Sequence, residues 1–510
     1  MVRHSKLDVN SQYIGRPLPI GVTQWLGIRY AAPPVGDLRF APPQDPANDP
    51  EPKQANEVSN IEPGRARTSE DCLFLDVYAP TWATSESKLP VFVFIQGGGF
   101  NGNTNPNLNG TGLIAASNNS IVFVTFNYRV GPYGFLTDGR QITANNGLRD
   151  QRKALHWVHI HIAKFGGDPA HVVIGGASAG AASVALHLMA YGGRDDALFN
   201  AAAAGSVSFG TMLTARESVY QYNNLLVRLD CVGHDPLACL RSKSASELQK
   251  KSAKSPYPGA MHAPLFMWGP VIDGEIITKL PYEAFRGGKF LKVPVIFGDD
   301  TNGGTVFAPD KTSTRSESNR WLMDQFPHLT INQLTRLSEL YPNSNQTMCP
   351  EKGCWWRQLS NIYGEMRYMC PGLFLNAAFA RHGVEASYAY RWNVEDSEEM
   401  AAGLGVPHTV EVGAIFGPDN IQEMAPESYH SNGTNADAVQ RIQGHWARFI
   451  KTLNPNHPQS DISTHWETWG ERPWSRLLFD TGGATRMEKI DSGLRERCEY
   501  LASIGIALHQ

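Results

Sequence analysis

Short runs of apolar residues alternate with helix-like stretches along the first half of the chain. The apolar runs cover residues 89–95, 121–126 and 171–174, and the helix-like stretches cover residues 147–165 and 181–189. Strands that are apolar throughout are buried on both faces, which is typical of parallel strands packed between layers of helices. The pattern therefore predicts an α/β fold with a large, mostly parallel central sheet and helices on both faces.

The second half of the chain continues this pattern less regularly. Residues 293–297 and 387–392 are predicted to be further strands, and residues 436–453 are predicted to be a helix. The stretches 206–290 and 311–385 follow neither period, so we expect them to be helical insertions over the C-terminal edge of the sheet. These insertions would shape a pocket, and their aromatic residues are candidates either for its walls or for the core.

Composition and charge exclude several classes of protein. The 510 residues carry 45 basic and 49 acidic side chains, a net charge of −4, which argues against a general nucleic-acid binder. No apolar run is long enough for a transmembrane helix, so no membrane partner is expected. Residues 1–13 lack the apolar core of a signal peptide, which predicts a cytoplasmic location, or a secreted one if a signal preceded Met1.

No repeat or linker divides the chain, so residues 1–510 are predicted to form a single domain.

The sharpest chemical signal is the pentapeptide Gly176-Ala177-Ser178-Ala179-Gly180. It follows a short apolar strand and precedes a helix of small residues, which is the context of a nucleophile elbow. Glycines are needed there because the serine occupies a strained turn with its neighbours pressed against the backbone. The alternative is a Gly/Ala-rich helix start that merely packs tightly.

A nucleophilic serine also needs donors for the negative charge that develops on the carbonyl oxygen. Three glycines, Gly97, Gly98 and Gly99, follow the apolar run at 89–95, and bare glycine backbone can direct its N–H groups inward. We therefore expect the oxyanion hole to consist of the N–H groups of Gly98, Gly99 and Ala179.

Ordered motifs along nearly the whole chain resemble the type-B carboxylesterase/cholinesterase family, in particular its fungal members. They are GIRYAAPPVGDLR at 27–39, EDCLFLDV at 70–77, QGGGF at 96–100, NYRVGPYGFL at 127–136, NGLRDQRKALHWVHIHIAKFGGDP at 146–169, the pentapeptide above, GDDTNGGTVFAP at 298–309 and GVPHTVEVGAIFG at 405–417. This resemblance implies an α/β-hydrolase fold and the hydrolysis of carboxylic esters.

The resemblance implies a catalytic triad in the order Ser, Glu, His. Ser178 matches the nucleophile and His408 matches the histidine, but Gly303 stands at the position of the glutamate. Ala177 replaces the glutamate that usually precedes the nucleophile. The serine that supports the catalytic acid in relatives is matched to Ala204, and together these changes are interpreted as an apolar wall behind the histidine.

Loss of the triad acid does not by itself abolish catalysis. It typically costs about 10⁴-fold in rate, yet a Ser–His pair with an oxyanion hole keeps about 10³–10⁴-fold over water. Asp299 and Asp300, shortly before Gly303, are candidates for a replacement acid, and Glu365 and Glu411 are further ones. Ordinary roles in turns, caps or packing are the alternative for all four.

The seven cysteines give a mixed signal about the redox environment. Cys231 and Cys239 match a disulfide of the family, whereas the partner that Cys72 has in many secreted relatives is missing. The spacing of Cys349 and Cys354 also allows a small loop to be closed. Reduced thiols at all four of these paired positions are the alternative.

The sequence therefore predicts a carboxylesterase-type serine hydrolase that acts on a medium-sized apolar ester, lactone or thioester. A place in fungal secondary metabolism is part of this prediction. The alternatives are a non-hydrolytic biosynthetic enzyme (cyclisation, elimination or acyl transfer) and a binding pseudoenzyme on the same fold. No motif indicates a cofactor or a metal ion, and the oligomeric state is left open.

Overall fold

The structure is a computed structural model. It describes residues 3–6, 12–47, 53–55, 69–102, 108–343, 352–421, 425–456 and 464–510.

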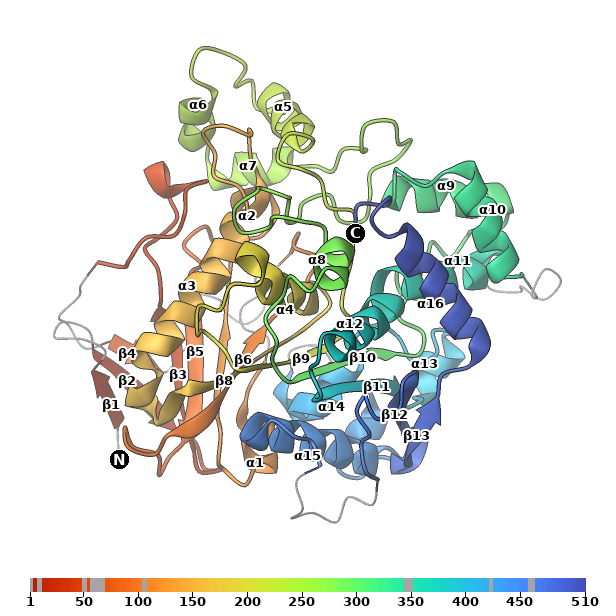
Figure 1. Ribbon diagram of the computed structural model, residues 1–510. Coiled ribbons are helices and arrows are strands. Elements are labelled where there is room, and N and C mark those ends of the chain that lie inside the picture. The colour runs from red at the N-terminus through yellow and green to blue at the C-terminus, as the bar shows by residue number, and fades with distance from the viewer. Residues whose placement is uncertain are drawn as a thin grey trace.

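Thirteen strands in these ranges form one sheet (Figure 1). The order is β1-β2-β3-β5-β7-β6-β8-β9-β10-β11-β12-β13, and β4 pairs with β2. The strands from β7 to β12 in this order are parallel to one another, and the pairs outside this block are antiparallel except for β2–β4, which is parallel. The strands are β1 Arg3–Lys6, β2 Gln12–Pro17, β3 Val22–Arg29, β4 Lys53–Ala55, β5 Phe74–Pro80, β6 Leu89–Ile95, β7 Val122–Phe126, β8 Gly167–Ala177, β9 Ala201–Gly205, β10 Val295–Asp300, β11 Ser387–Asn393, β12 Ser475–Asp480 and β13 Thr485–Lys489.

The central strands are apolar throughout because helices cover both of their faces. Along β6, Val91, Val93 and Ile95 pack into one hydrophobic core, and Phe92 and Phe94 pack into the core on the opposite face. The alternation follows from the two-residue period of a strand. The predicted α/β architecture with a mostly parallel sheet is thereby confirmed.

Helices α3, α4, α8 and α12 contribute to the first face, and α1, α14 and α15 pack against the second. Every residue of α4 is buried, and its two polar side chains, Ser183 and His187, are hydrogen-bonded to Gln151. The helices are α1 Thr111–Ala116, α2 Gly131–Phe135, α3 Asn146–His161, α4 Ala179–Met189, α5 Val219–Arg228, α6 Pro236–Ser242, α7 Ala245–Lys251, α8 Pro281–Arg286, α9 Arg315–Gln325, α10 Ile331–Leu340, α11 Trp356–Gly364, α12 Cys370–Arg381, α13 Ser397–Ala401, α14 Glu411–Phe416, α15 Ala436–Thr452 and α16 Ser492–Ile504.

The two stretches without a clear period contain helices α5 to α12. Helices α5 to α7 lie at the top of Figure 1, and α9 and α10 lie at its upper right. The second stretch is not an insertion along its whole length, since α12 packs directly against β10 and β11. A π-helical turn, Glu365–Met369, joins α11 to α12.

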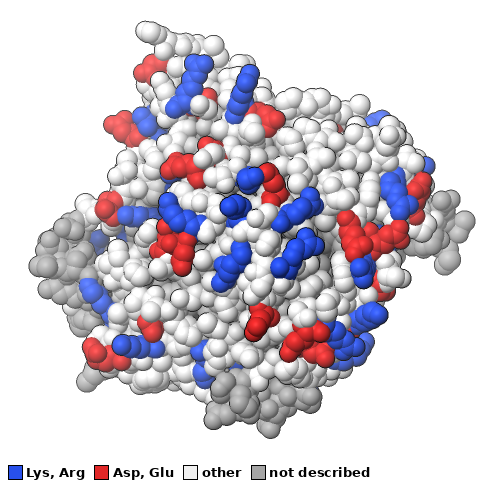
Figure 2. Space-filling view, in the orientation of Figure 1, with Lys and Arg blue, Asp and Glu red and all other residues white. Residues whose placement is uncertain are grey.

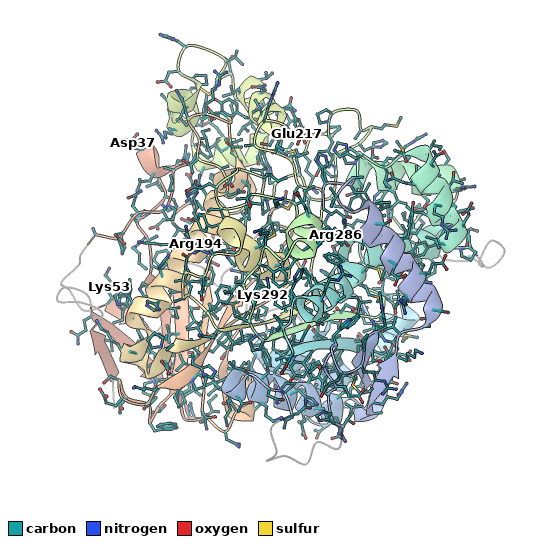
Figure 3. The ribbon with its side chains drawn as sticks, viewed as in Figure 1. Asp37, Lys53, Arg194, Glu217, Arg286 and Lys292 are labelled. Atoms are coloured by element: carbon teal, nitrogen blue, oxygen red, sulfur yellow. A yellow bond between two sulfur atoms is a disulfide. The ribbon has the colours of Figure 1, made fainter. Side chains whose placement is uncertain are left out.

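Acidic and basic side chains both occur on the face drawn in Figure 2. Several lysines and arginines gather near its centre, where Figure 3 labels Arg194, Arg286 and Lys292. Among the helices that the structure describes, none is long and apolar enough to cross a membrane.

Two disulfides crosslink the described chain. Cys231–Cys239 confirms the pairing that the resemblance implied, and Cys370–Cys498 joins α12 to α16 across 128 residues. Cys354 is disulfide-bonded as well, and Cys349 lies outside the described residues. Disulfides persist in oxidising compartments, so they weigh against the cytoplasmic location, which stays a prediction.

We expect the long-range disulfide to stabilise the fold more than the short one. In the chain-entropy picture, closing 128 residues is worth about 5 kcal/mol and closing 8 residues about 2.5 kcal/mol. Chemical unfolding of the variant Cys370→Ser/Cys498→Ser should therefore show the larger loss of stability. The variant Cys231→Ser/Cys239→Ser is the matched control, and an equal or larger loss in it would contradict the expectation.

Candidate active site

The nucleophile elbow lies where β8 ends at Ala177 and α4 begins at Ala179. Ser178 between them has φ 58° and ψ −122°, a left-handed conformation that is strained for any residue with a side chain. The turn brings the start of α4 against β6, because a Cβ on Gly180 would lie 1.9 Å from the carbonyl oxygen of Ile95. The glycine at 180 is therefore a packing requirement, as the pentapeptide indicated.

The three glycines after β6 lie beside this turn. A Cβ on Gly97 would lie 3.2 Å from Cβ of Ser178, and Gly98 and Gly99 have φ values of 100° and 61°. Within the described residues, the N–H groups of Gly98 and Gly99 have no acceptor. Ala179 is the first residue of α4, where N–H groups lack an intrahelical partner. The geometry thus leaves three N–H groups beside Ser178 available to an oxyanion.

His408 lies in the segment between β11 and α14, at the carboxyl end of the sheet. Its ring packs against Tyr368, with centroids 4.1 Å apart, and against Phe307, at 5.1 Å. Both ring nitrogens are buried, and neither has a hydrogen-bond partner in the part of the chain that the structure describes. Burial, and then the positive charge of Arg367, lower the pKa of His408 to about 3. The imidazole is therefore a neutral base.

Gly303 leaves a space next to this imidazole. A Cβ built on Gly303 would have His408 Nδ1 at 3.9 Å, the carbonyl oxygen of Asp300 at 3.8 Å and the ring of Tyr368 at 4.0 Å. These are ordinary van der Waals distances, so a side chain fits at this position. A carboxylate extending from residue 303 would start on the Nδ1 side of the ring, where a triad acid is needed.

The two candidate replacement acids have other partners. Asp299 lies 3.5 Å from Arg476, and Asp300 accepts hydrogen bonds from Ser206 Oγ at 3.0 Å and from the N–H of Thr409 at 2.8 Å. Both belong to β10, whose pleat directs neighbouring side chains to opposite faces before the loop at Gly303 begins. Neither carboxylate is bonded to the imidazole of His408, so the geometry gives no support to either as the triad acid.

The two remaining acids are also engaged elsewhere. Glu411 accepts a hydrogen bond from Tyr390 at 3.2 Å, and Glu365 accepts from Tyr341 at 2.7 Å and pairs with Arg497 at 2.7 Å.

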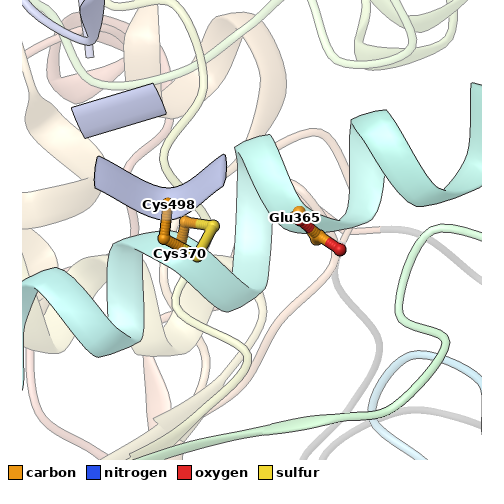
Figure 4. Close-up of side chains that lie close together, drawn as sticks. All are labelled: Glu365, Cys370 and Cys498. Carbon is orange, nitrogen blue, oxygen red and sulfur yellow. A yellow bond between two sulfur atoms is a disulfide. The ribbon is translucent and has the colours of Figure 1, made fainter. Parts of the chain in front are cut away.

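Glu365 also lies close to the sulfur atoms of Cys370 and Cys498 (Figure 4). Because these sulfurs form a disulfide, they offer no thiolate to a metal ion. The cluster is therefore a crosslink beside an ion pair.

The wall behind the histidine segment differs from the apolar wall that the sequence suggested. Ser206, two residues after Ala204, retains the polar contact and donates to Asp300, whose carboxyl also interacts with Glu411. Burial, and then the neighbouring Glu411 carboxylate, raise the pKa of Asp300 well above its usual range. The network holds the backbone at Thr409 rather than the imidazole. The serine after Gly205 was the sequence signal that could have revealed it.

A pocket opens beside Gly99. Its walls include Gly99, Ser208, Gly210, Phe266, Trp268 and Arg367. Four of them come from the stretch 206–290 that was expected to shape a pocket. Arg367, on the π-helical turn, is a pocket residue that sequence reasoning missed.

A strained serine between a parallel strand and a buried helix, with glycine N–H groups beside it, defines an α/β-hydrolase with a nucleophile elbow. The model of the carboxylesterase family matches residues 11–497, and the chain belongs to that family.

Individual relatives agree with this assignment. Lipase 1 of Geotrichum candidum is 37% identical over 63% of this chain and 67% of its own length. Cholinesterase of Mus musculus is 29% identical over 94% of this chain and 82% of its own. The crystal structure of Aspergillus niger EstA superposes with a TM-score of 0.93 and 39% identity, covering 100% of this chain and 99% of that one.

We expect Asp300→Asn to stabilise the protein at pH 8. Because the folded-state pKa of Asp300 is raised, the unfolded chain loses the proton first, and this group lowers stability as pH rises from about 4 towards the folded pKa. The amide of the Asp300→Asn variant still offers an oxygen that accepts hydrogen bonds from Ser206 and Thr409, but it does not ionise and therefore does not lower stability as pH rises. Urea unfolding should show a gain of about 1–3 kcal/mol at pH 8 that shrinks at pH 5.

Asp37→Asn, at an exposed site labelled in Figure 3, is the matched control and should change stability little at either pH. A gain for Asp300→Asn that is larger at pH 5 than at pH 8 would contradict this expectation.

Proposed function

We propose that this protein hydrolyses carboxylic esters with a Ser178–His408 pair that works without a triad acid. The observation that carries the proposal is the space at Gly303 beside the unpartnered Nδ1 of His408, in a chain that also has the elbow and the glycine N–H groups. The substrate is a medium-sized apolar ester, lactone or thioester. Relatives named as lipases and cholinesterase support an ester substrate.

The reaction begins when Ser178 Oγ attacks the substrate carbonyl and its proton passes to Nε2 of His408. The N–H groups of Gly98, Gly99 and Ala179 stabilise the negative oxygen that forms. His408 then protonates the leaving alkoxide, and water repeats the cycle on the acyl-enzyme. Hydrogen bonds between nucleophile and base are often long without substrate and tighten on binding.

Proton transfer is the difficult step in this site. In relatives a glutamate would offset the charge of the imidazolium, whereas here burial and Arg367 both oppose it. The proposed enzyme is therefore slow towards simple esters.

A second candidate is a non-hydrolytic reaction on the same scaffold, such as cyclisation, elimination or acyl transfer. The buried and neutral imidazole favours it, because a dry site disfavours attack by water. A binding role without catalysis is less well supported, since both Ser178 and His408 are present. A place in fungal secondary metabolism stays a prediction.

We expect Gly303→Glu to raise the hydrolysis of 4-nitrophenyl butyrate by about 10²- to 10⁴-fold, since the carboxylate would stabilise the imidazolium. Initial rates of the purified variants give the comparison, and Ser178→Ala should abolish turnover in both backgrounds. Gly303→Gln is the matched control, because it fills the same space without a charge. An equal gain from Gly303→Gln would refute the electrostatic explanation. Unchanged wild-type activity in Ser178→Ala would refute the proposed nucleophile.

The pH profile should differ between the wild type and Gly303→Glu. With a His408 pKa of about 3, the base stays neutral, and kcat/KM of the wild type should be flat between pH 8 and pH 5. A carboxylate beside the ring favours the charged form and raises its pKa, so Gly303→Glu should lose activity at a higher pH than the wild type. Gly303→Gln should keep the flat profile. A wild-type acid limb near pH 6.5 would contradict this expectation.

A further inference from the structure

Arg367 is a buried cation that the proposed reaction does not use. Its side chain is 9% exposed and lines the pocket beside Gly99. A guanidinium stays protonated in a protein, so the site holds a permanent positive charge. Throughout the described part of the chain, no carboxylate lies within ion-pairing distance of it. A buried charge without a partner lowers the stability of the fold, so stability does not explain why an arginine occupies this position.

The surroundings of Arg367 fix the guanidinium without neutralising it. Its Nε donates to Ser208 Oγ at 3.1 Å. The guanidinium carbon lies 5.3 Å from the ring centre of Phe266 and 5.9 Å from those of Tyr363 and Tyr368. Aromatic faces attract a cation, so these rings hold the group in place. None of them supplies a negative charge at neutral pH.

The backbone of Gly210 packs directly against the guanidinium. A Cβ on Gly210 would lie 2.6 Å from Nη1 and 3.0 Å from Nη2 of Arg367, and Gly210 lines the same pocket as Ser208. Because this wall leaves no room for a further group, a ligand reaches the Nη donors only from another side of the pocket, with Nε engaged by Ser208 and the Tyr368 hydroxyl also beside the guanidinium. Such a fork matches the two oxygens of a carboxylate.

The position of the pocket indicates which part of a substrate reaches Arg367. Gly99, one of the expected oxyanion donors, lines the pocket, whereas Ser178 and His408 do not. The leaving alcohol must lie next to His408, because that residue protonates it. The pocket therefore takes the acyl part of the ester.

We propose that Arg367 binds a carboxylate at the far end of the acyl group, so that the substrates are hemiesters of dicarboxylic acids. This inference rests on the proposed function and deepens it. A bound carboxylate would satisfy the Nη donors, and it would also offset the charge that opposes protonation of His408.

The test measures binding to a variant that cannot turn over. Isothermal titration of Ser178→Ala with monomethyl glutarate should give a dissociation constant about 10- to 100-fold lower than with methyl pentanoate, its neutral counterpart. In Ser178→Ala/Arg367→Met this preference should disappear. Equal binding of the two esters, or a preference that survives in Arg367→Met, would overturn the inference. Because no hydrolysis is needed, this failure is distinct from a failure of the proposed catalysis.

Two further variants guard against a purely structural effect. Arg357→Met removes another guanidinium that lies over an indole, 4.6 Å from the ring centre of Trp356, outside the pocket, and it should keep the preference. Arg367→Lys keeps the charge but loses the fork, so the preference should be reduced but present. If Arg367→Lys showed no more preference for monomethyl glutarate than Arg367→Met does, the conclusion that the positive charge binds the carboxylate would be overturned.

A last experiment tests whether the pocket binds the acyl part of the ester rather than the alcohol part. 4-Acetoxybenzoate carries its carboxylate on the alcohol part, and Arg367→Met should leave its binding to Ser178→Ala unchanged. A loss as large as that for monomethyl glutarate would overturn the assignment of the pocket to the acyl group.

Discussion

The left-handed turn at Ser178 is the constraint on which the rest of the site depends. A strained residue of this kind costs on the order of 1–3 kcal/mol and persists only where its surroundings hold it. Here the opposing contribution is the burial of α4, all of whose residues are removed from solvent between β6, β8 and the neighbouring helices. The same packing brings the glycine loop after β6 beside the serine. Nucleophile and oxyanion donors are thus positioned by one set of contacts.

The histidine segment is positioned in a different way. The N–H of Thr409 donates to Asp300, which is held by Ser206 and Glu411, so the backbone next to His408 is fixed from behind. The ring itself is fixed by packing against Tyr368 and Phe307. The proposed replacement of the triad glutamate by Gly303 would therefore remove an electrostatic partner and leave the support of the loop in place. In the proposed mechanism, position and charge stabilisation, which a triad acid usually supplies together, are separated.

Much of the fold could be predicted from the sequence because burial on two faces leaves a clear pattern. The run at 89–95 coincides with β6, and the helix expected at 436–453 is α15. The elbow was predictable because glycine is required at a fixed spacing. The orientation of Asp300 was not, since it depends on where β10 ends relative to the loop. Arg367 was missed because the π-helical turn interrupts the usual helical period, and the Cys370–Cys498 bridge joins segments that no local pattern relates.

The proposed loss of the triad glutamate and the unpaired Arg367 have a joint electrostatic consequence. A carboxylate near His408 would favour the imidazolium and offset the charge of the arginine. Without it, the net charge of the site is one unit more positive than that of a site with a complete triad. A positive field favours the oxyanion and disfavours the imidazolium, so it helps the attack and hinders the proton transfer that must accompany it. A neutral substrate cannot resolve this conflict. An anionic one can, because its charge reaches Arg367 only when it is bound. With an anionic acyl group bound at Arg367 as proposed, selectivity for charge and the loss of the acid would be two aspects of the same balance.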